Sequence, residues 1–194
     1  MISCISKMKE KIMQILKESQ AVQALIDTHL LQITIAAQII IDALKKGNKV
    51  MACGNGGSAL EAQHFIGELV GKFEKESKKP LPAIALTTDV GNITAIGNDY
   101  SFDLIFKRQI QALAKKGDVL ICFSTSGNSQ NIIKAVKDIK QIKTIALLGK
   151  GGGKMKGMCN VQIIINSQNT ARIQESHLLI LHILAKLIED TFTL

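Results

Sequence analysis

The sequence is poor in aromatic residues: among its 194 residues it has no Trp, one Tyr and six Phe. Single-stranded nucleic acid is commonly held on aromatic side chains interleaved with basic ones. No basic run here is interleaved in that way, so nucleic acid is not an expected partner despite a formal net charge of +8. The same charge would serve equally well to attract small anionic substrates.

Proline is also rare, with two residues, and the four cysteines are scattered without a C-x-x-C pair. Apolar residues make up 46% of the chain, so we expect one compact domain over residues 1–194 and no disordered segment. In a reducing compartment, isolated cysteines are usually small buried groups. We interpret Cys4, Cys53, Cys122 and Cys159 in this way, and not as a disulfide framework or a zinc knuckle.

A long uninterrupted apolar run is missing as well. The longest candidates, 32–44 and 178–188, contain polar residues and fall short of the roughly 18 residues that span a bilayer. The first 20 residues carry charges at helical spacing and lack the apolar core and cleavage site of a signal peptide. The sequence therefore predicts a cytoplasmic protein without a membrane partner.

Two helical patterns open the chain, over about residues 4–18 and 21–47. The second pattern has apolar residues around most of its surface, which indicates a helix buried on several sides. A single domain of this size has few layers with which to surround such a helix. We therefore expect the segment 1–47 to be used in oligomerisation.

After residue 48 the pattern changes, and short apolar runs alternate with helical stretches. The apolar runs are 49–53, 83–86, 118–123, 143–148 and 161–165, and the helices lie near 58–70, 103–116, 129–140 and 171–191. This alternation predicts a parallel sheet covered by helices on both faces, with right-handed crossovers, over an α/β core of residues 48–194. In such sheets ligands bind at the carboxyl ends of the strands.

The loop that follows the first predicted strand reads G-N-G-G-S-A over 54–59. It matches the G-x-G-x-x-A fingerprint of a dinucleotide site, in which glycines let the backbone approach phosphate. The acidic residue that should contact ribose lies about 20 residues further on in that fingerprint. The nearest candidate, Asp89, is about 30 residues on, so the fit is poor and no nucleotide cofactor is expected.

The third predicted strand ends in S-T-S-G-N-S, residues 124–129. Hydroxyl groups and backbone amides at such a turn can donate hydrogen bonds to phosphate, whereas a simple helix cap needs only one hydroxyl. We therefore interpret this loop as a phosphate cradle. The glycine-rich segment 149–154 is no P-loop, because its spacing is wrong and Met155 stands where Ser or Thr binds magnesium. We expect a mobile surface loop there.

Four polar residues on two predicted helices are candidates for chemistry. His64 and Glu68 are four residues apart, so they lie about 40° apart on one helix face. Gln174 and His182 lie on the last helix, about 80° apart by the same geometry. A histidine in an apolar stretch is more often a core residue than a ligand. Spacing alone does not bring the two helices together.

Taken together, five motifs resemble the SIS (sugar isomerase) domain family, and within it the isomerases of phosphorylated heptoses. The motifs are C-G-N-G-G-S at 53–58, A-Q-H-F-x-x-E-L at 62–69, G-N-D at 97–99, S-T-S-G-N-S at 124–129 and A-R-I-Q-E-x-H at 171–177. They occur in the family's order and cover nearly the whole chain. The resemblance implies a flavodoxin-like α/β/α sandwich of three layers with a five-stranded parallel sheet, preceded by two N-terminal helices.

The resemblance also implies a homotetramer with sites at subunit interfaces, and a reaction. The reaction converts D-sedoheptulose 7-phosphate to D-glycero-D-manno-heptose 7-phosphate, the first step toward nucleotide-activated heptose for surface polysaccharide, whether lipopolysaccharide or capsule. In chemical terms the protein is then an intramolecular oxidoreductase that interconverts a ketose and an aldose.

The matching positions imply roles for individual residues. Glu68 would be the base and His182 the acid. The residues that would bind substrate are Asn55, Gly56, Gly57, Ser58, Glu68, Asn98, Asp99, Ser124, Thr125, Ser126, Ser129 and Gln174. Some members of the family bind zinc, which implies one ion per subunit held by His64, Glu68, Gln174 and His182.

The implied chemistry agrees with these residue types. Moving a carbonyl from C2 to C1 requires a base that removes a carbon-bound proton and a second group that moves protons among the oxygens. A metal can polarise the carbonyl as a Lewis acid. Glu68 cannot easily serve as a tight zinc ligand and as a free base at once. Zinc would then be structural, regulatory or weakly bound.

The main alternative is a non-catalytic SIS protein that binds phosphosugar and the bacterial replication initiator. It shares the fold, the tetramer and much of the phosphate loop, but lacks acid and base residues at the positions of Glu68 and His182. Both residues are present in this sequence, which favours the enzyme. An isomerase for a shorter phosphosugar is a second alternative that no single residue excludes.

Overall fold

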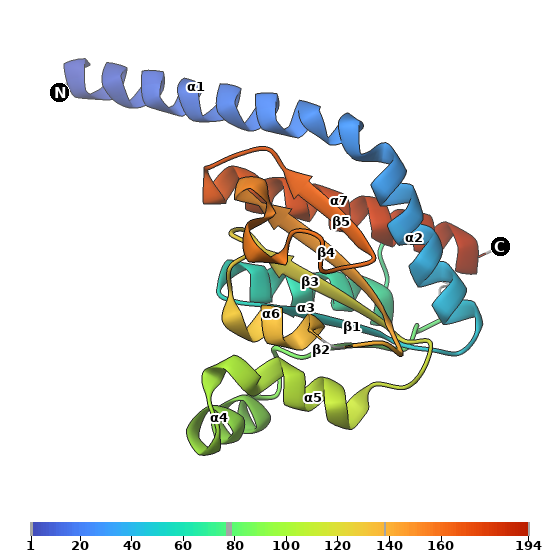
Figure 1. Cartoon of the computed structure of the whole chain (residues 1–194). Helices are drawn as coiled ribbons and strands as arrows, with labels where there is room; N and C mark the ends of the chain where they lie inside the picture. The colour runs from blue at the N-terminus through green and yellow to red at the C-terminus, as the bar shows by residue number, and fades with distance from the viewer. Residues whose placement is uncertain (1, 77–78, 138, 194) are drawn as a thin grey trace.

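The computed structural model describes residues 2–76, 79–137 and 139–193. Its centre is a parallel sheet of five strands in the order β2-β1-β3-β4-β5 (Figure 1). The strands are β1 (Val50–Gly54), β2 (Ala83–Ala85), β3 (Val119–Ser124), β4 (Lys143–Gly149) and β5 (Val161–Ile165). The five predicted strands are confirmed, with ends that differ by one residue at most.

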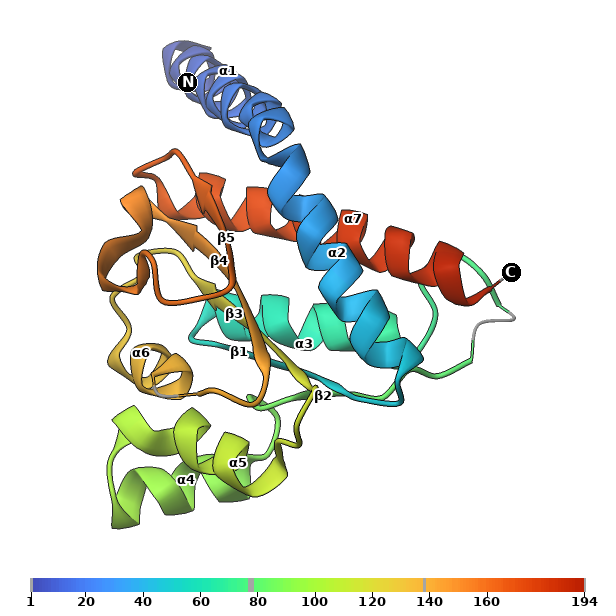
Figure 2. The ribbon, with the colours of Figure 1, turned by 45° about the vertical axis from the view of Figure 1, so that its right-hand side comes forward.

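Helices cover both faces of this sheet (Figure 2). One face carries α2 (Leu30–Lys45), α3 (Gly57–Val70) and α7 (Thr170–Phe192), and the other carries α4 (Val90–Asp99), α5 (Ile105–Leu113) and α6 (Gln130–Val136). Short 3-10 helices are η1 (Leu25–His29), η2 (Phe102–Leu104) and η3 (Lys150–Met155). The predicted fold, an α/β/α sandwich of three layers with a five-stranded parallel sheet, is confirmed.

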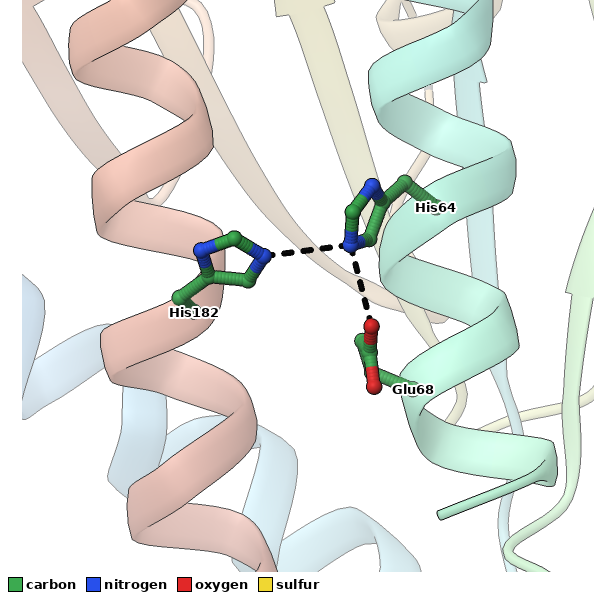
Figure 3. Close-up of side chains that lie close together, drawn as sticks. All are labelled: His64, Glu68 and His182. Carbon is green, nitrogen blue, oxygen red and sulfur yellow. Dashed lines mark hydrogen bonds and ion pairs between the residues drawn. The ribbon is translucent and has the colours of Figure 1, made fainter. Parts of the chain in front are cut away.

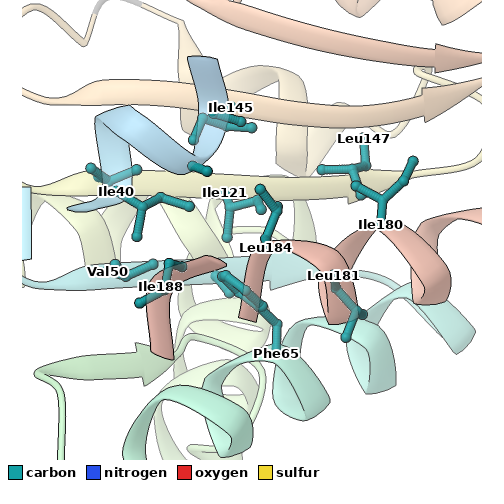
Figure 4. Close-up of a cluster of buried hydrophobic side chains, with 14 of the residues drawn as sticks. Ile40, Val50, Phe65, Ile121, Ile145, Leu147, Ile180, Leu181, Leu184 and Ile188 are labelled. Carbon is teal, nitrogen blue, oxygen red and sulfur yellow. The ribbon is translucent and has the colours of Figure 1, made fainter. Parts of the chain in front are cut away.

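Alternation along each strand divides the core in two. In β3, Val119, Ile121 and Phe123 face α2, α3 and α7, whereas Leu120 and Cys122 face the opposite layer. Successive strand residues point to opposite faces, and here both faces are apolar because both are covered. Figure 4 shows the first of these clusters, in which Phe65 of α3 and Leu184 of α7 meet the strands.

The N-terminal helices differ in their boundaries from the prediction. The chain is helical from α1 (Ile2–Ala24) through η1 to α2, so the change of direction falls at 25–29 and not near residue 20. The buried side chains of α2 pack in the core of the same subunit, among them Ile33, Ile40 and Leu44. The first part of α1 extends away from the body (Figures 1 and 2).

Among the described residues, one helical stretch is long and apolar enough to cross a membrane by length and composition, Cys4–Lys45, with a window of mean hydropathy 1.6. The sequence pattern alone predicted no span of that length. A third of the window, 33%, is buried inside the protein, and core helices of soluble proteins pass the same test. One such helix is therefore weak evidence for a membrane span.

The cysteine interpretation holds for two of the four residues. Cys53 and Cys122 are fully buried neighbours on β1 and β3, with their Sγ atoms 3.5 Å apart. Cys159 is half-buried, and burial raises the pKa of its thiol to about 11. Cys4 is exposed on α1, contrary to the expectation of a buried group. All four are free thiols.

Candidate active site

The helices α3 and α7 lie side by side on the same face of the sheet and bring the four candidate residues together. At the start of α3, Gly57 touches the Gln174 side chain of α7: a Cβ on Gly57 would lie 2.1 Å from Gln174 Nε2. Glycine at this position therefore leaves room for the end of the Gln174 side chain against the start of α3. Further along the two helices, His64 and Glu68 of α3 lie within reach of His182 of α7.

Figure 3 shows these three side chains converging from the two helices. The Nε2 atom of His64 lies 3.1 Å from Nε2 of His182 and 2.9 Å from Oε1 of Glu68. A neutral imidazole nitrogen has one in-plane position, holding either a hydrogen or a lone pair. His64 Nε2 therefore cannot satisfy both neighbours at once through a hydrogen bond of its own. The arrangement favours a shared cation or proton at this point.

This donor set fits zinc. One ligand atom from each of His64, Glu68 and His182 lies within 4.8 Å of the others. Two imidazoles and a carboxylate are common zinc ligands, and at tetrahedral geometry two ligand atoms lie roughly 3.3 Å apart. The separations of 3.1 and 2.9 Å are close to that value.

A cavity of about 400 Å³ opens beside this cluster. Pockets that bind small molecules have volumes of roughly 300–1,000 Å³. The cavity is lined by Gly57, Leu60, Glu61, His64, Ala171, Gln174, Glu175 and Leu178. Two predicted substrate-binding residues, Gly57 and Gln174, thus share one cavity wall with His64.

The predicted phosphate cradle is held in shape by its own hydroxyl groups. Ser124 Oγ accepts a hydrogen bond from Gly127 N at 3.1 Å, and Ser126 Oγ accepts one from Asn128 N at 3.2 Å. A hydroxyl that accepts a hydrogen bond keeps its own hydrogen for donation. Ser124 and Ser126 therefore remain able to donate to a ligand, as do Thr125 and Ser129 in the same loop.

The glycine-rich segment packs against this cradle, unlike the mobile surface loop that the sequence predicted. Met155 is fully buried and donates its backbone N–H to Gly127 O at 3.0 Å. Lys154 N donates to Asn128 Oδ1 at 3.0 Å. The approach is so close that a Cβ on Gly153 would lie 2.3 Å from Ser126 O. The segment thus forms the outer wall of the loop at 124–129.

The loop after β1 connects the cradle to α7. Asn55 and Asn131 exchange two amide hydrogen bonds of 2.8 Å, which tie this loop to the first turns of α6. Ser58 is buried, and Gly56 has a φ of 55°, a value that favours glycine. Because β1 and β3 are neighbours in the sheet, their carboxyl ends place both loops at one edge.

Asn98 and Asp99 stand apart from the other predicted site residues. They form the exposed C-terminal end of α4, where Asn98 Nδ2 donates to Asp99 Oδ1 at 2.8 Å. In the described part of the chain, no hydrogen bond or ion pair joins them to the α3–α7 cluster or to the cradle. A single subunit therefore does not unite all of the predicted site.

The helix α4 was not predicted from the sequence, although a helix-capping residue precedes it. The Asp89 side chain accepts a hydrogen bond from Asn92 N at 2.9 Å and caps the helix. Asn131 was also missed, because nothing in the sequence marks it as the partner of Asn55. Two further residues between α3 and α7, Glu61 and His177, had no assigned role.

Comparisons with known proteins agree with this geometry. A family model described as SIS domain matches residues 15–149. A phosphoheptose isomerase of Nitratiruptor is 54% identical over 159 residues, covering 81% of this chain and 84% of the relative. One from Campylobacter jejuni serotype O:6 is 44% identical over 194 residues, 99% and 100% of the two chains. The structure of phosphoheptose isomerase from Neisseria gonorrhoeae matches with a TM-score of 0.88 and 40% identity, covering 94% of this chain and 99% of that one.

Proposed function

The chain belongs to the SIS domain family, among its phosphoheptose isomerases, and from this we propose that it converts D-sedoheptulose 7-phosphate to D-glycero-D-manno-heptose 7-phosphate through an enediol. The observation that carries the proposal is the meeting of Glu68 and His182 beside a cavity of about 400 Å³. A carboxylate and an imidazole that lie close together are the two groups that an aldose–ketose isomerisation requires, and His64 of the same cluster lines the cavity.

The two groups divide the proton transfers. Glu68 removes a proton from C1 of the ketose, and the electrons of that bond form the double bond of the enediol. Return of the proton to C2 leaves the carbonyl at C1. His182 moves the hydroxyl proton from the oxygen on C1 to the oxygen on C2. The net change is the exchange of carbonyl and hydroxyl between the two carbons, with no other reactant.

The remaining predicted residues would hold the sugar and its phosphate. Hydroxyls of Ser124, Thr125, Ser126 and Ser129 donate to the phosphate, which the surplus of O–H groups in this loop supports. Gln174 and the loop from Asn55 to Ser58 contact the sugar from the cavity side. Asn98 and Asp99 belong to the substrate site in this proposal through the neighbouring subunit.

Zinc is a proposed cofactor, one ion per subunit. His64, Glu68 and His182 would hold it, with Gln174 as a fourth ligand from the same cavity wall. Zinc could supply a Lewis acid for the sugar oxygens, but because Glu68 would be both ligand and base, a structural, regulatory or weakly bound ion fits the proposed reaction better. With the ion bound, His64 would hold it together with Glu68 and His182, so that all three side chains would point to the same position. Without the ion, its Nε2 is held by Glu68 at 2.9 Å.

We propose a homotetramer with the sites at subunit interfaces. The apolar side chains exposed on α1 support it: they are Ile5, Met8, Ile12, Met13, Ile15 and Leu16, each at least 42% exposed. The separation of Asn98 and Asp99 from the cluster supports it as well. The enzyme would act in the cytoplasm, without nucleic-acid or membrane partners. Its product would be a precursor of a surface polysaccharide, either lipopolysaccharide or capsule.

The test is a proton NMR assay of purified protein with sedoheptulose 7-phosphate. Wild type should produce aldoheptose 7-phosphate, and Glu68→Gln should lower kcat by about 10²- to 10⁴-fold because the base is lost. Glu76→Gln, an exposed glutamate beyond the same helix, is the matched control and should match wild type. Binding of the sugar phosphate by wild type without any turnover would favour the non-catalytic, initiator-binding alternative instead.

A further inference from the structure

The contacts between α3 and α7 follow one another in register along two parallel helices. Residue numbers rise together on both sides, which defines three successive cross-contacts: Gly57 with Gln174, Glu61 with His177, and His64 with His182. Beyond the end of α3, the backbone of Phe73 and Glu74 continues the series with Glu189. Along α3 the second cross-contact lies about one helical turn from His64 and about two turns from Glu68.

This second cross-contact is a buried pair of titratable side chains that the proposed reaction does not use. The His177 ring is fully buried, and the Glu61 side chain is 8% exposed. His177 Nδ1 lies 3.5 Å from Glu61 Oε2, and His177 Nε2 lies 3.2 Å from Leu148 O at the end of β4. The pair thus connects α3, α7 and the sheet in a single chain of contacts.

The contact with Leu148 fixes the place of one hydrogen on the His177 ring. A carbonyl oxygen only accepts, so His177 Nε2 carries the hydrogen in its contact with Leu148 O. If Nδ1 and the carboxylate were both bare, a lone pair would face a negative charge in a buried site. A hydrogen on either Nδ1 or Glu61 removes that conflict. Among the described residues, neither His177 Nδ1 nor the Glu61 oxygens form a hydrogen bond, so their contact at 3.5 Å is an ion-pair distance only.

Glu61 does not touch the substrate. It contributes to the cavity wall, yet both of its carboxylate oxygens have essentially no accessible surface. They point inward, to His177. Any influence of Glu61 on the reaction must therefore act through the placement of other side chains.

We propose that Glu61 and His177 are positioning residues, which fix α3 against α7 and so set the separation of His64 and Glu68 from His182. This inference rests on the proposed function. The hydrogen bond from His177 to Leu148 O is directional and fixes the ring against the sheet, and the Glu61 carboxylate of α3 lies 3.5 Å from that ring. A displacement of about 1 Å among reacting groups can cost about a hundredfold in rate.

The first experiment compares Glu61→Gln with Ser176→Ala in steady-state kinetics. Ser176 is the matched control, because it is fully buried next to His177 but bonds only Arg172 O in its own helix. We expect Glu61→Gln to lower kcat about tenfold or more and to change KM less than about twofold, because the phosphate cradle is untouched. Ser176→Ala should keep the wild-type kcat. A folded Glu61→Gln protein with wild-type kcat would overturn the proposal.

A paired apolar variant separates positioning from stability. Replacing a buried ion pair by apolar residues is often neutral or stabilising. Glu61→Met combined with His177→Leu should therefore unfold at or above the wild-type temperature, yet keep the lowered kcat. Recovery of both stability and kcat in this variant would show that the pair only fills space.

Crystal structures of wild type and Glu61→Gln, solved side by side, decide the matter without an activity assay. We expect the distance between His64 Nε2 and His182 Nε2 to change by about 0.5 Å or more, and an unchanged distance contradicts positioning. If wild type does not turn over sedoheptulose 7-phosphate, the proposed function fails, and these structures still test the role of the pair.

Discussion

The Nε2 atoms of His64 and His182 lie 3.1 Å apart, although 118 positions separate the two residues in the chain. The contact is possible because α3 and α7 run side by side on one face of the sheet. Glu68 approaches the same nitrogen of His64 from the other direction, at 2.9 Å. Because Nε2 of His64 faces two partners at once, we predict that a zinc ion binds at this point.

Zinc should bind wild-type protein with one ion per subunit, as measured by isothermal titration calorimetry on protein freed of metal. His64→Gln should weaken binding by roughly a hundredfold or more, because loss of even an outer partner of a ligand costs tenfold to a hundredfold. Zinc should also raise the thermal unfolding temperature of wild type, since it binds the folded state.

The control for this measurement is His29→Gln. His29 lies in η1, outside the cluster, and its replacement should leave the affinity unchanged. Equal loss of zinc binding in both variants, or full affinity in His64→Gln, would contradict the assignment of the ligands.

Gly153→Ala should raise KM for the sugar phosphate about fivefold or more while affecting kcat less. A Cβ at Gly153 would lie 2.3 Å from Ser126 O, so the cradle at 124–129 must shift. Gly151→Ala is the matched control, because it has a comparable positive φ of 76° but nothing within 4 Å of its Cβ. Both positions have a positive φ that disfavours alanine, and Gly153, with a ψ of −146°, is the more strained of the two; only Gly153→Ala adds the clash. Equal KM values in Gly153→Ala and Gly151→Ala would argue against a role of the segment around Gly153 in phosphate binding.

Asp118→Asn should lower the free energy of unfolding by about 2 kcal/mol at pH 7. Burial would raise the pKa of Asp118, but hydrogen bonds from the Lys49 ammonium and from the backbone N–H groups of Lys49 and Lys115 outweigh it, so the pKa is lowered. A lowered pKa gives stability above the unfolded value of about 3.9, which is lost as the pH falls through the native value.

Urea unfolding at pH 7 and near pH 3, at one protein concentration, checks this expectation. The difference in stability between the two pH values should be smaller in Asp118→Asn than in wild type. Asp42→Asn serves as the control, because Asp42 is exposed and bonds only Gln38. A wild-type acid response in Asp118→Asn would refute the assignment.

Charges placed on α1 should reduce the size of the assembly. Ile12 and Leu16 are 55% and 49% exposed on one face of α1. Burying an acidic side chain in an interface without a partner is unfavourable, so Ile12→Glu with Leu16→Glu should shift the molar mass in size-exclusion light scattering from four subunits to fewer. Gln14→Glu on the opposite side of the helix should leave the mass unchanged. An unchanged tetramer in the double variant would place the interface elsewhere.

The sheet could be predicted from the sequence because its strands are buried on both faces. Such strands are continuous apolar runs, as in Val119–Ser124, and their alternation with helices fixes parallel pairing. The same rule placed the loops at 54–58 and 124–129 at one edge of the sheet. The i, i+4 spacing placed His64 beside Glu68.

The remaining features depend on contacts that no local pattern reports. Nothing near His182 in the sequence indicates that it faces His64, and helical periodicity continues across the break at 25–29. The segment around Gly153 has the composition of a free loop, yet it is fixed by hydrogen bonds from its backbone N–H groups to Gly127 O and Asn128 Oδ1. Asn98 and Asp99 match a motif, and their link to the site stays a prediction.

The position of α7 at the end of the element order has a consequence for the gene. A premature stop codon before Thr170 leaves the coding sequence of all five strands and of His64 and Glu68 intact, but removes Gln174 and His182. During synthesis the two halves of the reactive cluster can meet only after the last helix has been made. Nonsense and frameshift alleles upstream of the codon for His182 should therefore be null for turnover, even where a folded remnant accumulates.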